Sequence, residues 1–337
     1  MIFPPGKLPL DVLDRLLSRH TTHSDPRVIV GARVGEDAAV IDFGDRYLVA
    51  KSDPITFATS EIGHYAIHVN ANDIAAMGAT PRWFLATVLL PENSTDEALI
   101  DGIFASLHAS ASEVGVSICG GHTEITVGLD RPILVGQMLG EVAKDKLVLS
   151  ANLAVGDCLL LTKGLGIEAT AIMAHEKQAI LAAAGIPDTV IAKAARYLRE
   201  PGISILKEAQ IATHTASIKA MHDPTEGGIA TALRELALAS HVGLLIDGDA
   251  LYISPETERL CTHFHLDPLG VISSGALLIG AAASDVEAVQ TAIRRAGIRC
   301  DRIGQVKEAS FGLKLSNNQI VRDLPQFDRD EIGKIFA

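Results

Sequence analysis

The sequence predicts an α/β or α+β protein made of two domains, each with two layers. The chain has 337 residues, which exceeds the roughly 100–200 residues of a typical single domain. Short β-branched runs alternate along it with segments in which apolar residues recur at helical spacing. Residues 150–156 show neither pattern and end in Gly156-Asp157. We therefore predict a domain boundary there, between residues 1–150 and residues 151–330.

The N-terminal half begins with a predicted amphipathic helix over Leu10–His20. Strands are predicted at Val28–Val30, Ala39–Ile41, Tyr47–Lys51, Trp83–Leu90, Val116–Cys119 and Ile133–Val142, and helices at Ile62–Met77 and Thr95–Val114. Gly78 and Pro81 supply the stop signals of the first of these helices, and Thr95 or Asp96 caps the second. We expect Gly120-Gly121 to form a turn after its strand.

The C-terminal half repeats the mixture of strands and helices. Strands are predicted at Cys158–Thr162, Leu244–Ile246 and Gly275–Ile279, and helices at Gly166–His175, Pro187–Leu198, Gly228–Ala239 and Val286–Ala296. This pattern indicates a second α/β unit.

Composition and charge exclude several classes of protein. Aspartate and glutamate number 41 against 29 lysines and arginines, a net charge of −12, whereas nucleic acids and anionic membranes attract positive surfaces. The longest nearly apolar stretch, residues 271–283, is shorter than the roughly 20 residues of a membrane span, and the N-terminus lacks a signal-peptide pattern. The four cysteines, at positions 119, 158, 261 and 300, form no C-x-x-C pair and are expected to be buried, reduced thiols. We therefore expect a cytoplasmic protein that binds neither nucleic acid nor membrane.

An acidic set of residues is the first candidate for chemistry. Asp37, Asp53, Asn70 and Asp73 each lie near a predicted strand end or helix. Carboxylates that converge from separate loops suit Mg²⁺, which takes one or two of them and completes its shell with water and phosphate oxygens. Asn70 and Asp73 are three residues apart and share a helix face. Taken singly, Asp37 and Asp53 are also explained as ordinary turn residues.

Two glycine-rich segments are candidate phosphate-binding loops. Gly120-Gly121, followed by His122, would let backbone N–H groups approach a phosphate, although such pairs are also common in turns. In the segment from Asp223 to Gly228, Asp or Thr would cap the next helix and Gly227-Gly228 would admit a ligand. Lys163, beside a glycine, is either a phosphate ligand or a solvated side chain. The sequence contains no P-loop, nucleophile elbow or dinucleotide-binding fingerprint.

Histidines offer a weaker set of candidates. His64 and His68 have the i, i+4 spacing with which a helix can clamp a transition metal. Because the sequence shows neither the glutamate of H-E-x-x-H nor an evident third ligand, two surface or core histidines are the favoured interpretation. For His222 beside Asp223, capping or packing is favoured over an acid/base pair, since adjacent side chains generally point apart.

Several segments in one order resemble a known superfamily. They are GEDAAVI, SDP, NANDIAAMGATP, GGHTE, GDCLLLTKGLG, EPGISILKEA, HDPTEGG and SSGALLIGA, between roughly residues 30 and 280. In this order they resemble the ATP-binding superfamily of aminoimidazole ribonucleotide synthetase, selenophosphate synthetase, thiamine-monophosphate kinase and the hydrogenase maturation factor that makes the cyanide ligand. The D-P-T-x-G-G form at Asp223–Gly228 is most similar to the maturation factor and to proteins related to aminoimidazole ribonucleotide synthetase.

The resemblance implies a fold, a cofactor and a reaction. The N-terminal sheet would form a barrel with that of a second subunit, the C-terminal domain would be an α+β sandwich, and Mg-ATP would bind in the cleft between the domains. By motif match, Asp37, Asp53 and Asp73 would hold Mg²⁺, and Asp53 and Asp73 would be the catalytic pair. The implied cofactor-binding residues are Asp37, Asn70, Gly120, Gly121, His122, Lys163, Asp223, Gly227 and Gly228. The implied enzyme is a ligase- or kinase-like phosphotransferase that passes the γ-phosphate of ATP to an oxygen or selenium nucleophile of a small acceptor, in some members with later loss of phosphate.

Departures from each member keep other functions open. The maturation factor ends in Pro-Arg-Ile-Cys, whereas this chain ends in Ile335-Phe336-Ala337. Glu226 stands where that factor has Arg. His122 stands where that factor has Asp, and this histidine is more similar to selenophosphate synthetase. We therefore expect an acceptor particular to this chain. The alternatives are a non-catalytic ATP-binding partner protein, including one that works with a hydrogenase maturation factor, and an enzyme similar to thiamine-monophosphate kinase or selenophosphate synthetase.

Overall fold

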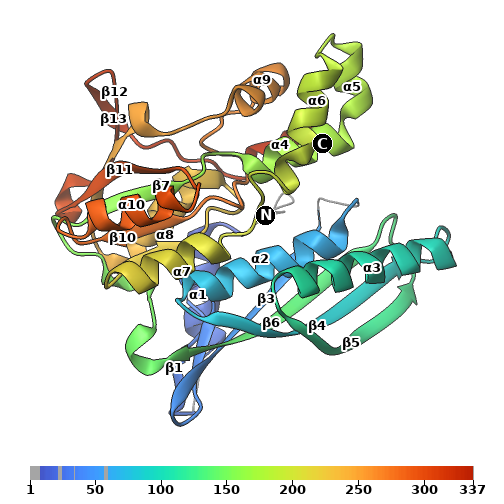
Figure 1. Ribbon diagram of the computed structural model, residues 1–337, viewed down its shortest axis with the longest axis horizontal. Helices are drawn as coiled ribbons and strands as arrows, with labels where there is room; N and C mark the ends of the chain where they lie inside the picture. The colour runs from blue at the N-terminus through green and yellow to red at the C-terminus, as the bar shows by residue number, and fades with distance from the viewer. Residues whose placement is uncertain (1–7, 22–24, 34, 57–59, 337) are drawn as a thin grey trace. The chain divides into compact units, whose positions relative to one another are not determined.

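The computed structural model describes residues 8–21, 25–33, 35–56 and 60–336 (Figure 1). Contacts divide the chain into two compact units. The N-terminal unit consists of residues 25–31 and 38–147, and the C-terminal unit contains residues 148–336 together with the described parts of residues 1–24 and 32–37. Helix α1 (Leu10–His20), which begins and ends where the sequence predicts, therefore belongs to the C-terminal unit.

The N-terminal unit is built on a six-stranded sheet in the order β1-β2-β3-β6-β4-β5. Its strands are β1 (Val28–Val30), β2 (Ala39–Asp42), β3 (Arg46–Ile55), β4 (Thr80–Pro91), β5 (Ser117–Thr126) and β6 (Ile133–Ala143). Only β4 and β5 run parallel, because helix α3 (Glu97–Glu113) connects them. The sheet is open: within the described residues, β1 pairs only with β2 and β5 only with β4.

Helix α2 (Ile62–Ala76) covers one face of this sheet and is buried at every position. Strands β4 and β6 alternate between buried and partly exposed residues, so the side chains of one face pack beneath the helices and the other face is uncovered. Helix α3 packs against α2, and Asp96 caps it by accepting a hydrogen bond from the backbone N–H of Leu99. Of the two predicted caps, Asp96 is confirmed.

The prediction of a turn at Gly120-Gly121 is wrong, because strand β5 continues through both residues. A bulge shifts the register of β5 against β4 just before Gly120, and Gly121 has φ +146°. A Cβ at Gly121 would lie 1.9 Å from the carbonyl oxygen of Ala86 on β4. The glycine therefore permits close contact between two strands. Cys119, on the same edge strand, is exposed, so its predicted burial is also wrong; the other three cysteines are buried and none is in a disulfide.

The C-terminal unit is built on a seven-stranded sheet in the order β13-β12-β9-β11-β7-β10-β8. Its strands are β7 (Cys158–Thr162), β8 (Ala220–His222), β9 (Gly243–Asp247), β10 (Leu278–Ala281), β11 (Cys300–Lys307), β12 (Leu313–Asn317) and β13 (Ile320–Asp323). Its remaining helices are α4 (Ile167–Glu176), α5 (Gln178–Ala183), α6 (Asp188–Ala195), α7 (Leu206–Thr215), α8 (Gly228–Ser240), α9 (Pro255–Phe264) and α10 (Val286–Arg295). The neighbours β9 and β12 are parallel, and the other pairs are antiparallel.

The core of this unit lies between the sheet and α8. Side chains of Leu233 and Leu236 on α8 pack with Leu159, Leu161 and further aliphatic residues of the sheet. Strand β7 is buried at every position, so the opposite face is also covered; α10 contacts β7 and β11 there and packs on α7 (Figure 1). The predicted fold class, with mixed α/β units and two sheets, is confirmed.

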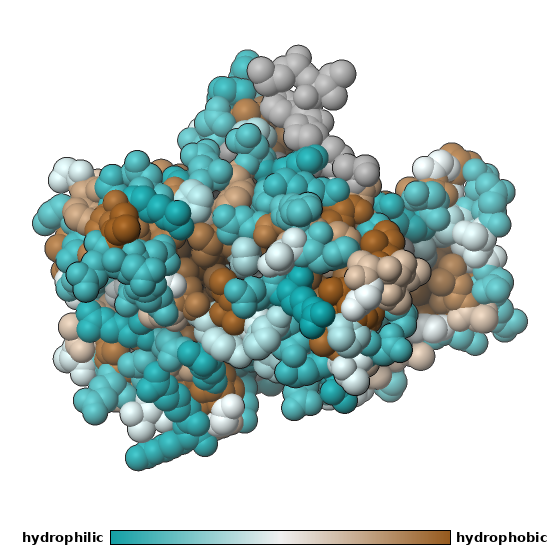
Figure 2. All heavy atoms as spheres, turned by 90° about the horizontal axis from the view of Figure 1, so that it is seen from above, coloured by the Kyte–Doolittle hydropathy of each residue, from teal (hydrophilic) through white to brown (hydrophobic). Residues whose placement is uncertain are grey.

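One face of the molecule is mostly hydrophilic. Figure 2 shows hydrophilic side chains over most of one face, with hydrophobic side chains in small groups between them. Among the described residues, no helix is long and apolar enough to cross a membrane.

Candidate functional site

Two of the predicted carboxylates lie close together in the N-terminal unit. Asp53 comes near the end of β3, and Asp73 is on the last turn of α2. The ammonium of Lys51 lies 3.3 Å from Oδ2 of Asp53 and 3.4 Å from Oδ2 of Asp73. The Asp73 side chain is 3% exposed and that of Asp53 29%. The two carboxylates therefore share one cation, with Asp53 at the edge that solvent reaches.

Asn70 holds Asp53 in place through the backbone. Its Oδ1 accepts a hydrogen bond from the N–H of Asp53 at 3.0 Å, and its Nδ2 donates to the carbonyl of Ala66 at 2.9 Å. A Cβ at Gly136 on β6 would lie 2.4 Å from that Nδ2, so the glycine makes room for the amide. Asn70 is fully buried, and its side-chain oxygen and nitrogen both form hydrogen bonds with backbone groups, which fixes β3 to α2.

A second set of charges is buried in the C-terminal unit around His222. Its Nδ1 lies 2.5 Å from Oδ1 of Asp37 and its Nε2 lies 2.8 Å from Oε2 of Glu235 on α8. Burial alone would lower the pKa of His222, but the carboxylates of Asp37 and Glu235 outweigh it and raise the pKa well above 6.5. Asp223 is also buried, and one ligand atom each of Asp37, His222 and Asp223 lie within 4.8 Å of one another. The predicted residues Asp37 and Asp223 are thus close in space.

Two further buried carboxyl groups belong to this unit. Desolvation raises the pKa of Glu168 on α4 to about 8, with smaller contributions from the charges of Glu226, Asp330 and Asp223. Desolvation also raises the pKa of Asp330 to about 7, although the carboxyl accepts hydrogen bonds from the N–H groups of Gly227 and Ile332. Because several acidic groups are buried near one another, the binding of protons or cations to them is favoured.

The glycines of the segment 223–228 are used for packing. Gly227, with φ +81°, is the N-cap residue of α8 and has no side-chain cap, so the prediction that Asp or Thr caps this helix is wrong. A Cβ at Gly228 would lie 2.6 Å from the carbonyl oxygen of Val271 and 2.7 Å from that of Leu269. The chain folds closely over these carbonyls, and the glycine pair is needed for that approach.

The ammonium of Lys163 is bound within the C-terminal unit. It lies 2.9 Å from Oε1 of the buried Glu208 and donates to the carbonyl oxygens of Gly202 and Ser204. The residue has φ +56°, a left-handed conformation that a lysine rarely adopts. The side chain is 7% exposed. It is therefore not a solvated surface lysine.

The remaining predicted residues are on β5. Gly120 and Gly121 are within the strand, and His122 is exposed, with Nε2 3.3 Å from Oε2 of Glu124. All three residues are exposed to solvent in the single chain.

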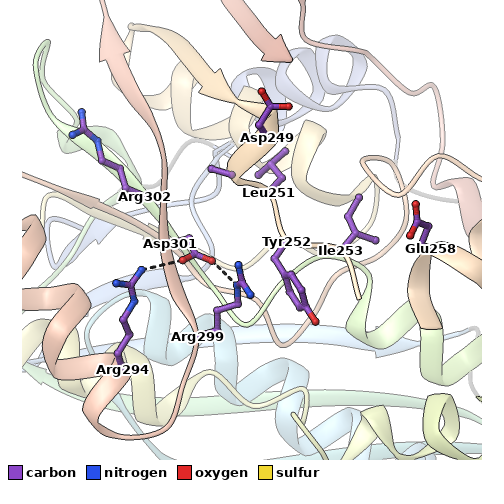
Figure 3. A pocket seen from close by; sticks show the side chains of 10 residues that line it. Asp249, Leu251, Tyr252, Ile253, Glu258, Arg294, Arg299, Asp301 and Arg302 are labelled. Atoms are coloured by element: carbon purple, nitrogen blue, oxygen red, sulfur yellow. Dashed lines mark hydrogen bonds and ion pairs between the residues drawn. The ribbon is translucent and has the colours of Figure 1, made fainter. Parts of the chain in front are cut away.

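A pocket of about 520 Å³ lies on the C-terminal unit (Figure 3). Asp301 lies 3.0 Å from Arg294 and 2.5 Å from Arg299, and the Arg299 guanidinium lies 3.9 Å from the centre of the Tyr252 ring. Tyr252 and Arg299 also line a second pocket of about 440 Å³ that includes Lys163. Fixed guanidinium groups suit a carboxylate or a phosphate. Of the predicted residues, only Lys163 lines either of these two pockets.

The sequence analysis missed several residues of these clusters. Lys51 is two residues before Asp53 on β3. Because side chains alternate along a strand, this spacing places both on one face, and it could have indicated Lys51. Glu168, Glu235 and Asp330 gave no such signal, because they come from separate helices or loops and their acidity is not local to any motif.

Comparisons with known proteins agree with this architecture. Residues 35–142 match the family described as AIR synthase related protein, N-terminal domain, and residues 154–315 match its C-terminal domain. A carbamoyl dehydratase HypE from Rhizobium leguminosarum bv. viciae is 30% identical over 270 residues, which cover 77% of this chain and 73% of that protein. The crystal structure of HypE in complex with HypF has a TM-score of 0.76 at 19% identity, covering 94% of this chain and 99% of that one. HypE in complex with ATP has a TM-score of 0.72 at 22% identity, covering 94% and 95%.

Proposed function

The chain belongs to the AIR synthase related family, and from this premise we propose that it is an Mg-ATP-dependent phosphotransferase. It passes the γ-phosphate of ATP to an oxygen of a small-molecule acceptor. In that step the bond between the γ-phosphorus and the ADP oxygen breaks as the bond to the acceptor oxygen forms. Because a similar protein is named carbamoyl dehydratase, we expect the acceptor to be an amide or thiocarbamate oxygen. The carbon–oxygen bond of the phosphorylated group then breaks, the phosphate leaves with that oxygen, and the nitrogen gives up its protons as a C≡N group forms.

The observation that carries this proposal is the convergence of Asp53 and Asp73 on a single cation. Lys51 lies within 3.4 Å of both carboxylates, which shows that their oxygens are close enough to serve one positive charge. Such a donor set fits Mg²⁺, which would neutralise charge on the phosphates when bound. Asp37, which belongs to the C-terminal unit and pairs there with His222, stays a prediction from the family resemblance as a third ligand.

Other residues of the chain position Asp53 and balance the charges of the proposed site. Asn70 fixes the backbone of Asp53 on β3, so less backbone freedom would be lost there when a cation binds. Lys51 would supply a positive charge close to bound phosphates if Asp53 and Asp73 held the metal. His222, charged between Asp37 and Glu235, orients the Asp37 carboxylate through its Nδ1.

The test is calorimetry of ATP binding with and without Mg²⁺, followed by phosphate release from the same sample. We expect Asp73→Asn or Asp53→Asn to weaken Mg-dependent binding at least tenfold, because each removes a carboxylate charge from the metal. The matched control is Asp130→Asn, whose side chain is 87% exposed in a loop of the same unit. Full ATP binding and turnover in Asp53→Asn would contradict the assigned role.

A non-catalytic ATP-binding partner is the alternative that the same experiment addresses. Phosphate release with any acceptor eliminates it, and tight Mg-ATP binding without release across a panel of amide and carbamoyl acceptors favours it.

Because HypE has been crystallised with HypF, we also propose that this chain works with a maturation-factor partner. We place it in the cytoplasm, where ATP is plentiful and its four free cysteines stay reduced.

We further propose that the chain is a homodimer joined through the N-terminal sheet. Strand β5 is exposed at nine of its ten positions and, among the described strands, pairs with β4 alone. A long unpaired edge with exposed apolar side chains such as Ile118 and Ile125 is ordinarily covered by another chain. A second copy offers the same strand and would extend both sheets.

A further inference from the structure

Three side chains that ligate metals meet between α2 and α3, in a region that the proposed activity does not use. His64 and His68 come from α2 and Glu113 is the last residue of α3. One ligand atom from each of the three lies within 4.8 Å of the others. The sequence offered the histidine pair but no third ligand, and the packing of the two helices supplies it.

The helices are close for an identifiable reason. A Cβ at Gly63 would lie 2.6 Å from the backbone nitrogen of Leu107 and 3.0 Å from Ser106, so only glycine allows this approach. Next to Gly63 on α2 and one turn beyond Leu107 on α3, Nδ1 of His64 lies 3.2 Å from Oγ of Ser110. Beyond that, Nε2 of His68 lies 3.7 Å from Oε2 of Glu113. The spacing of three or four residues on each helix keeps these groups on the facing sides.

The geometry suits a small cation with nitrogen and oxygen ligands. The two imidazole rings have centroids 4.1 Å apart and an interplanar angle of 50°. Two ligand atoms on a tetrahedral zinc ion are about 3.3 Å apart, given bond lengths of about 2.0–2.1 Å. The 3.7 Å between Nε2 of His68 and Oε2 of Glu113 is near this value, and the Glu113 side chain is 57% exposed.

The environment of the three residues also favours a cation. His64 and His68 are 2% and 1% exposed, and Ser110, at 1%, holds one ring nitrogen of His64, as partners behind metal-bound histidines commonly do. Glu113 places a negative charge at the C-terminus of α3, where the helix dipole disfavours it unless a cation is near.

We propose that His64, His68 and Glu113 bind one Zn²⁺ ion. Two histidines and one glutamate are a recognised zinc donor set, with the remaining position open to water. The ion joins the first two turns of α2 to the end of α3. Since α2 also carries Asn70 and Asp73, zinc would fix the helix that supports the proposed ATP site, while taking no part in that site itself.

The experiment is metal titration of the full chain after treatment with a chelator and in the absence of ATP and Mg²⁺. Co²⁺ reports on histidine coordination by its visible absorption, and Zn²⁺ is then measured by displacement of the cobalt signal. We expect one equivalent in the wild type. We expect an affinity at least tenfold lower in Glu113→Gln and in Ser110→Ala, and no signal in the double variant His64→Gln/His68→Gln.

Two controls separate this site from the proposed ATP site. Glu97→Gln changes an exposed glutamate at the opposite end of α3, and Asp53→Asn changes the proposed magnesium site; both should leave the cobalt signal unchanged. Because Glu113 is exposed, its variant should fold even if the histidine variant does not, and circular dichroism checks this. Absence of a stoichiometric signal, full affinity in Glu113→Gln, or loss of the signal in Asp53→Asn would each overturn the proposal.

Discussion

The protonation of Glu168 is set by burial. The residue is 5% exposed, and desolvation raises the pKa of its carboxyl from 4.5 to about 8. The nearby acidic groups Glu226, Asp330 and Asp223 add to the shift, and the raised pKa of Asp330, about 7, has the same main cause. At neutral pH without a bound cation, the C-terminal unit therefore holds protons that an unfolded chain would release.

This has a predictable effect on stability. Between pH 4.5 and about 8 the folded chain binds more protons at Glu168 than the unfolded chain, so the free energy of unfolding falls as pH rises through that window. One pKa unit corresponds to about 1.4 kcal/mol. We expect the Tm of the wild type to fall by several degrees from pH 5 to pH 8, and that of Glu168→Gln to fall less.

Thermal unfolding monitored by circular dichroism measures this difference. The control is Glu287→Gln, an exposed glutamate on α10 that should keep the wild-type pH dependence. Identical Tm profiles for the wild type and Glu168→Gln would show that Glu168 is ionised in the folded protein across the range.

At the scale of elements, the sequence predicted those helices and strands whose own residues show a clear periodicity. Helices α1 and α8 and strands β6 and β7 lie within one or two residues of their predicted ranges. The predicted strand at Gly275–Ile279 lies instead at Leu278–Ala281. Short strands β8, β12 and β13 were not predicted, because three to five residues carry too little periodicity and are stabilised by pairing with strands remote in sequence.

Strand β5 offers a direct test of how an element is fixed by its neighbour. A Cβ at Gly121 would overlap the Ala86 carbonyl of β4, and φ +146° is unfavourable for alanine. We therefore expect Gly121→Ala to lower the free energy of unfolding by about 1–3 kcal/mol or more, as overpacking does. Chemical denaturation measures the change.

The matched control for this prediction is Gly102→Ala. Gly102 is inside α3, a Cβ there meets nothing within 4 Å, and alanine favours helices over glycine by about 1 kcal/mol. We expect this variant to be equally or more stable than the wild type. Equal stability of Gly121→Ala and Gly102→Ala would mean that β4 and β5 are not held as closely as the structure shows.

At the scale of the whole molecule, the open sheet of the N-terminal unit is the feature that a single chain leaves incomplete. The barrel that the resemblance implied is not closed within one chain, because the described strands end in two unpaired edges. Exposed backbone at such an edge is an association site unless something covers it.

We expect the wild type to have a molar mass in solution of twice 35.6 kDa. The double variant Ile118→Asp/Ile125→Asp should shift it toward the monomer, because it places charges on the 41% and 56% exposed apolar positions of β5. Light scattering after size-exclusion chromatography measures the mass. Val155→Asp, at a 52% exposed position of the C-terminal unit, is the control; a monomeric wild type or an unaffected β5 variant would exclude this interface.

The sequence by itself determined the α/β class, the order of most helices and strands, and the motifs that name the family. These depend on periodicity, on capping and on short segments read along the chain, all of which are local. The tertiary structure decided which groups meet: Lys51 with Asp53 and Asp73, His222 with Asp37 and Glu235, and Glu113 with His64 and His68. The partners in each cluster come from different elements, so their distances follow from how helices pack on sheets and on each other, which no local pattern specifies.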